Sequence, residues 1–96
     1  MANWKPKKID LATDLSTVLS TPAIVRGFYV NTTLSAHPCD INNGSDIVFI
    51  IPASLVAGTV VDFAGEQGVL FDVNIIIDPD DSATGSITIM YIERVQ

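Results

Sequence analysis

The sequence predicts an all-β protein that folds as a small antiparallel β-sandwich, jelly-roll-like or Ig-like, of about seven to nine short strands. Runs of branched aliphatic and aromatic residues alternate with turns containing Gly, Pro and Asn along most of the 96 residues. Several runs carry apolar side chains at both odd and even positions, which favours two packed layers over a single sheet. No segment has a persuasive helical pattern.

The most strand-like segment is Ala23–Thr32, which carries aliphatic and aromatic residues on both sets of alternate positions. We therefore expect a central strand with something packed against each face. Ser86–Ile92 has a similar composition and is its expected neighbour in the sheet. Arg26 is the unusual residue of the central strand, and we expect it to pair with a carboxylate of the acidic body or of a neighbouring subunit.

The other strands are expected in order along the chain: two short strands within Ile9–Leu19 broken near Thr13–Asp14, a polar strand at Ser35–Ile41, an apolar strand at Asp46–Ile51, a strand at Thr59–Phe63, and one element over Val69–Phe71 and Asn74–Ile77 bent around Asp72. A helix is the alternative for Ile9–Leu19. Its β-branched and hydroxyl side chains count against a helix interior. Residues 65–68 and 78–85 are expected to be turn and loop.

Asn42-Asn43-Gly44 is the strongest turn signal in the chain. Asn-Gly between two apolar runs favours a tight hairpin, so Ser35–Ile41 and Asp46–Ile51 are predicted to pair. Pro38 cannot donate a ladder hydrogen bond, and we therefore expect the first of these strands at an edge or a bulge.

The chain is expected to form one sandwich domain, residues 9–96, preceded by a basic N-terminal arm, residues 1–8. Its net charge is −6, which argues against nucleic-acid binding. Three of the five cations lie in the arm, which is either a solvated tail or a segment that crosses the acidic surface of a neighbour. The single tryptophan either fills a pocket on a neighbour or folds back onto its own sandwich. The predicted partner-binding residues are Trp4, Lys5, Lys7 and Lys8.

No arrangement of side chains in the sequence indicates catalysis, and we expect no enzymatic activity, no cofactor and no metal. His37 and Cys39 are two residues apart on one strand, but a surface histidine and a buried thiol are the simpler interpretation. The Asp78–Asp81 segment lacks the spacing of a calcium loop and reads as a solvated turn. A single cysteine cannot form an internal disulfide.

We expect neither a secretory signal nor a membrane span, because no apolar run follows the first lysines and none is long enough to cross a bilayer. The residues are 48% hydrophobic and only 17% charged. A domain this small has difficulty burying so much apolar surface, which favours a homo-oligomer or a docked partner.

The order of features resembles the small all-β virion proteins of tailed bacteriophages, in particular the capsid decoration, or cement, type. Three segments carry the resemblance: the Ser/Thr-rich lead-in Leu15–Pro22 running into the central strand, the hairpin around Asn43-Gly44, and the ending from Gly68 through Asn74–Ile77 to Ala83–Tyr91. The resemblance is a pattern of strands and turns rather than a signature motif.

This resemblance implies a non-enzymatic structural protein of the virion that binds the outside of a phage head and stabilises it. The implied partner is the major capsid protein or another virion protein, and the implied assembly is a homo-oligomer, with a trimer favoured. Such a protein is made in the host cytoplasm and ends on the capsid surface. The alternative is a tail, baseplate or head-fibre adaptor, or a host-surface binding module.

Overall fold

The structure is a computed structural model, and it describes residues 4–12, 17–63, 67–80 and 82–93. These residues form nine strands and no helix: β1 (Lys5–Asp10), β2 (Thr17–Leu19), β3 (Ala23–Thr32), β4 (Cys39–Asn43), β5 (Asp46–Ile51), β6 (Val60–Asp62), β7 (Val69–Phe71), β8 (Ile75–Pro79) and β9 (Ser86–Glu93). Within the same residues there is no helix long and apolar enough to cross a membrane.

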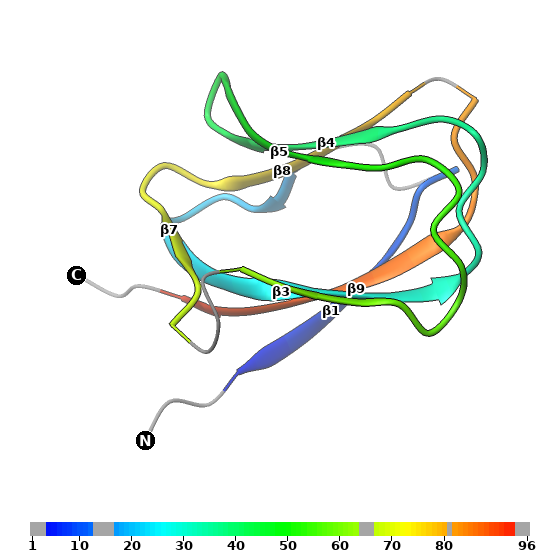
Figure 1. The fold of residues 1–96 in the computed structure, drawn as a ribbon. Coiled ribbons are helices and arrows are strands. Elements are labelled where there is room, and N and C mark those ends of the chain that lie inside the picture. Colours follow the sequence, from blue (N-terminus) through cyan, green and yellow to red (C-terminus); the bar gives the residue numbers. More distant parts are fainter. Residues whose placement is uncertain (1–3, 13–16, 64–66, 81, 94–96) are drawn as a thin grey trace.

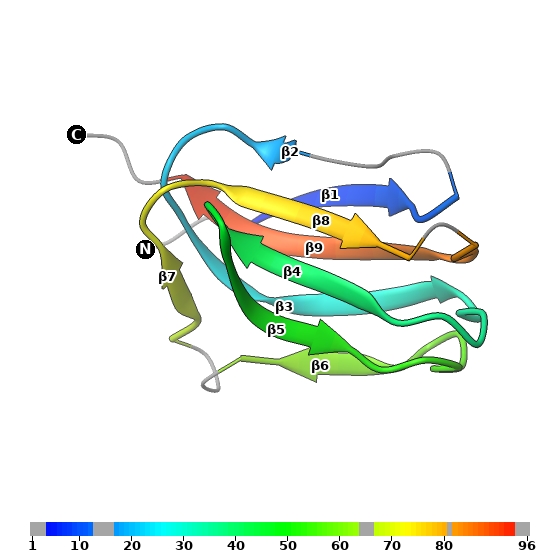
Figure 2. The ribbon, with the colours of Figure 1, turned by 90° about the horizontal axis from the view of Figure 1, so that it is seen from above.

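The strands form two antiparallel sheets that pack face to face (Figure 1). Sheet A has the order β1-β9-β3-β6, with β7 also pairing β3, and sheet B has the order β2-β8-β4-β5. Seen from above, the four strands of sheet B lie over those of sheet A (Figure 2). The predicted antiparallel β-sandwich is confirmed.

The pairing of the strands is nested about the turn between β4 and β5. The fourth strand pairs the fifth, β3 pairs β6 and β7, β2 pairs β8, and β1 pairs β9. A long antiparallel hairpin with this nesting, rolled up until β3 meets β9 and β4 meets β8, gives the jelly-roll strand order. Of the two sandwich types that the sequence predicts, the strand order is that of a jelly roll.

The core lies between the sheets and follows the period of two in the strands. Alternate residues of β3, β8 and β9 are buried, among them Val25, Ile77 and Ile89. Phe49 of β5 stacks on Phe63 with ring centroids 4.1 Å apart, which joins the two sheets beside their β5 and β6 edges. Burying each such side chain stabilises the fold by about 1.5–3 kcal/mol.

Three predictions about single strands are confirmed. Ala23–Thr32 is a strand inside its sheet, and Ser86–Glu93 lies next to it in antiparallel pairing. The hairpin joins β4 to β5, and Gly44 in its turn has a φ of 61°, which a glycine adopts without strain.

The same turn also anchors the connection between β7 and β8. The Asn43 side chain donates to Asp72 Oδ1 at 2.7 Å and accepts from the Val73 backbone amide at 2.9 Å. The Gly44 amide donates to Asn74 Oδ1 at 2.8 Å.

Several predictions about position were wrong. For the strand that follows Pro38, the predicted edge position is wrong, because β4 lies between β8 and β5 and its ladder begins only at Cys39. The alternative, a bulge, does occur in the β4–β5 pairing, between Ile41 and Asn42. Residues 69–77 are not one bent element: β7 belongs to sheet A and β8 to sheet B. The predicted loop at 78–85 begins after Pro79, since Asp78 and Pro79 complete β8. The predicted break near Thr13–Asp14 and the first half of the turn at 65–68 lie outside the described residues.

Residues 5–8 form the first part of β1 rather than an arm, and β1 pairs with β9 from Lys5 to Asp10. The sequence pattern missed this strand because three lysines and a proline dominate it. Lysine and proline are also the residues that commonly protect an edge strand from unwanted pairing.

A candidate partner-binding face on sheet A

The outer face of sheet A carries apolar side chains where an exposed sheet face is normally polar. Residues paired across an antiparallel ladder point to the same side, so the register defines the rows on this face. One row, from β9 across β3 to β7, is entirely aliphatic: Ile92, Ile24 and Leu70. The next row contains Pro6, Met90, Gly27 and Asp62, and the third contains Lys8, Thr88, Tyr29 and Val60.

The described part of the chain covers these rows only in part. Leu70 is 50% exposed, Val60 56% and Tyr29 40%, whereas Ile24, Met90 and Ile92 are partly exposed. The expectation that β3 has something packed on each face is therefore met on one side only within this structure. The other side is an exposed apolar face, and monomeric proteins seldom leave such a face in contact with solvent.

Trp4 and Arg26 also lie together on this face. The Arg26 guanidinium carbon is 5.8 Å from the centroid of the Trp4 ring, a cation–π distance. Trp4 therefore contacts its own sandwich, which is the second of the two roles predicted for it from the sequence. Arg26 occupies an irregularity in the β3–β9 register, between Val25 and Gly27.

The Nε of Arg26 is buried and has no hydrogen-bond partner among the residues that the structure describes. The described residues contain no carboxylate paired with Arg26 either, so the predicted ion pair within the chain is not found there. An unpaired buried donor costs about 1–3 kcal/mol.

The three lysines of β1 do not form one cluster. Lys8 shares the outer face with Thr88 and Tyr29, whereas Lys5 and Lys7 pair with Tyr91 and Ile89, on the side of the core. All three are exposed, because β1 is the edge strand of sheet A. Lys5 Nζ lies 3.7 Å from Glu93 Oε1, an exposed ion pair of small energetic value.

Of the predicted partner-binding residues, Trp4 and Lys8 thus lie on this outer face, while Lys5 and Lys7 lie at its edge and point away. The aliphatic row and Tyr29 were not predicted as binding residues. Their only sequence signal was the apolar character of both faces of Ala23–Thr32, which sequence analysis read as burial.

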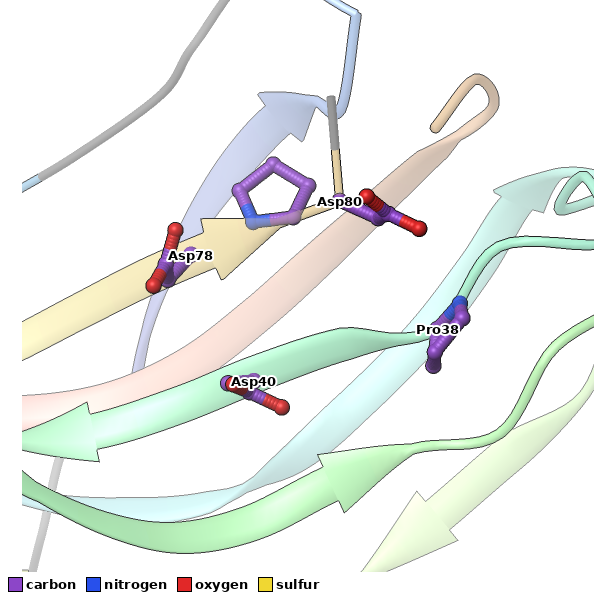
Figure 3. A pocket seen from close by; sticks show the side chains of 5 residues that line it. Pro38, Asp40, Asp78 and Asp80 are labelled. Carbon is purple, nitrogen blue, oxygen red and sulfur yellow. The ribbon is translucent and has the colours of Figure 1, made fainter. Parts of the chain in front are cut away.

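A shallow depression of about 350 Å³ lies on the outer side of sheet B (Figure 3). Pro38, Asp40, Asp78, Pro79 and Asp80 line it. Asp40 and Asp78 stand directly opposite each other on β4 and β8, and like charges in this position destabilise a sheet. Among the described residues, no group of three or more His, Cys, Asp or Glu side chains could hold a metal ion.

His37 and Cys39 have separate environments. His37 Nδ1 lies 3.1 Å from Asp80 Oδ2 at the surface, whereas Cys39 is 1% exposed in the core. Burial, together with the charges of Asp40 and Asp78, raises the pKa of the Cys39 thiol to about 12. A buried thiol that stays protonated is a poor nucleophile, so the pair does not form a reactive Cys-His site.

The Cys39 environment makes a prediction for alkaline pH. We expect the native thiol to resist alkylation at pH 8 and to react only on unfolding. Its folded pKa lies above the ordinary value of 9.0, so the unfolded state gains the thiolate first. Stability that is complete below pH 9 should then fall as the pH rises towards 12. Cys39→Ala should remove this loss in urea titrations between pH 8 and pH 11, and an equally steep loss in the variant would contradict the assignment.

No protein-family model, curated protein or solved structure gives a significant match to the chain.

Proposed function

We propose that the protein is a non-enzymatic structural component of a bacteriophage virion, a decoration protein that binds the outside of the head and stabilises it. The observation that carries this proposal is the outer face of sheet A, where Tyr29, Val60 and Leu70 are exposed beside partly exposed aliphatic side chains. Trp, Arg, Tyr and Met are the residue types enriched in the buried centres of protein interfaces. Trp4, Arg26, Tyr29 and Met90 all lie on this face.

The fold and charge support the same proposal. The jelly-roll strand order is common in viral capsid domains, although a fold alone does not assign a function. The aliphatic row runs across three adjacent strands, which gives a continuous apolar contact surface. Many identical weak contacts on a symmetric shell would add through avidity.

On this proposal, the major capsid protein presents an apolar surface to the aliphatic row and an acceptor to the partly exposed Arg26 side chain. Lys8 on one side of the face and Asp62 on the other would set the orientation. Deleting residues 1–8 is a poor test of these contacts, because it removes most of β1 as well as Trp4.

The direct test is co-sedimentation of the purified protein with empty capsids of its own phage. We expect the protein to pellet with the capsids in a saturable manner and to raise the temperature at which they disassemble. Protein that stays in the supernatant at every concentration would overturn the proposal. Pelleting with isolated tails or host cells, but not with capsids, would support the alternative of a tail or head-fibre adaptor or a host-surface binding module.

A further inference from the structure

The strand β5 is the exposed edge of sheet B, and its sequence is unusual for an edge. After Asp46 it is entirely apolar, and Ile47, Val48 and Ile50 are 57%, 37% and 61% exposed. Unpaired backbone groups beside such side chains form a template for pairing with another chain.

The other edges of the described sandwich are protected in ways that β5 is not. The edge strand β1 carries three lysines and Pro6, which cannot donate to a new ladder. At the remaining edges, β2, β6 and β7 are only three residues long. Val48 lacks an opposite residue on β4, a bulge that twists β5 but adds no charge to it.

We propose that the edge of β5 binds the same edge of a second copy of this chain, so that two copies pair about a two-fold axis. Antiparallel pairing about a two-fold axis at Phe49 would place Val48 opposite Ile50 of the second copy, twice, and both side chains are exposed. The Asp46 side chains would fall at opposite ends of the contact, beyond Ile51, so no like charges would face each other. The strand is therefore complementary to itself.

A second copy can pair with β5 through its own β5 or through its other long edge strand, β1, and β5 is the better match. Pairing β5 with β1 of a neighbour would place lysines against isoleucines and would bring Pro6 into the ladder. Contacts between two identical patches give two-fold dimers, whereas a three-fold ring requires two different complementary patches. Because the β5 edge is apolar and the β1 edge is basic, β5 pairs better with another β5 than with β1. The two edges therefore favour a dimer over the trimer that the virion resemblance implies. This inference does not depend on capsid binding.

Sedimentation equilibrium tests the contact with the full chain. We expect a wild-type mass of twice 10.3 kDa and a mass of 10.3 kDa for Ile50→Lys. Ile50 lies opposite Asp40 on β4, so the new lysine gains a carboxylate neighbour and the fold should be retained. Leu70→Lys is the matched control, because it places the same charge at a half-exposed aliphatic position on the outer face of sheet A and should leave the dimer intact.

Hydrogen exchange of the wild type provides a second measurement that does not depend on any variant. Amides of residues 46–51 should exchange about tenfold more slowly at a concentration where the dimer forms than after dilution to the monomer. A monomeric wild type, a trimer, or an Ile50→Lys variant that keeps the wild-type mass would each overturn the two-fold β5 contact. So would exchange in β5 that is independent of concentration.

Discussion

Phe71→Ala should lower the free energy of unfolding by about 3–5 kcal/mol, the largest effect that we expect from a single substitution. Phe71 is fully buried and is the largest side chain in that state. It lies in β7, opposite Ala23 of β3, and packs into the core between the sheets. Truncation removes its burial and leaves a cavity that the surrounding strands cannot close. Because small domains are stable by only about 5–15 kcal/mol, the variant should lose a large fraction of its stability.

Urea unfolding followed by circular dichroism measures this effect. The neighbouring substitution Leu70→Ala is the control, because Leu70 is half-exposed on the outer face and should change the midpoint little. Equal midpoints for the two variants would show that β7 does not close the core as the structure describes.

Gly27→Ala should cost about 1–3 kcal/mol, or more, because the new methyl group would overlap backbone atoms. A Cβ at this position would collide with the carbonyl oxygen of Val61 and lie 3.0 Å from Asp62 Cα. These atoms belong to β6, the strand that pairs with Gly27, so no side-chain rotation relieves the overlap. The sheet must open between β3 and β6.

This second effect has a local signature. Hydrogen exchange should accelerate in residues 60–62 while β1 and β9 keep their protection, because only the β3–β6 ladder is forced apart. Val60→Ala, which shortens an exposed side chain of β6, should leave the protection of that ladder unchanged. A Gly27→Ala protein with wild-type stability and exchange would contradict the close approach of the two strands.

Most of the strands were predictable from the sequence, because most are local runs of apolar and β-branched residues bounded by turn formers; the lysine-rich first half of β1 is the exception. Ala23–Thr32, the Asn-Gly hairpin and the last strand appear where the sequence predicts them. Local pattern does not determine which sheet a strand joins. The separation of β7 and β8 into different sheets depends on contacts with β3 and β4, which lie far away in sequence.

The candidate site was less predictable than the fold. Trp4 and the lysines stand out in the sequence, because Trp4 is the single tryptophan and three of the five cationic residues lie in residues 1–8. Trp4 and Lys8 do lie on the outer face of sheet A. The sequence pattern does not distinguish an apolar side chain that is buried in the core from one that is exposed and free to bind a partner. Ile24 and Val25 are adjacent and similar, yet only the register with β9 and β7 shows that Ile24 faces outward.

The two surfaces can be tested independently because they lie on different sheets. The outer face of sheet A is proposed to contact the capsid, and the β5 edge of sheet B is proposed to join two copies. Leu70→Lys should therefore affect capsid binding and leave the mass unchanged, whereas Ile50→Lys should affect the mass. Loss of the dimer would also reduce capsid occupancy, since avidity depends on linked sites.

The most direct test of the central claim is the occupancy of empty capsids by two lysine variants measured side by side. Leu70 is 50% exposed on the outer face of sheet A, and Val73 is 53% exposed in the connection after β7. We expect Leu70→Lys to bind capsids about tenfold more weakly than the wild type, a loss of about 1.4 kcal/mol. Val73→Lys should bind like the wild type. Equal occupancy by Leu70→Lys and the wild type would contradict the assignment of this face to the capsid.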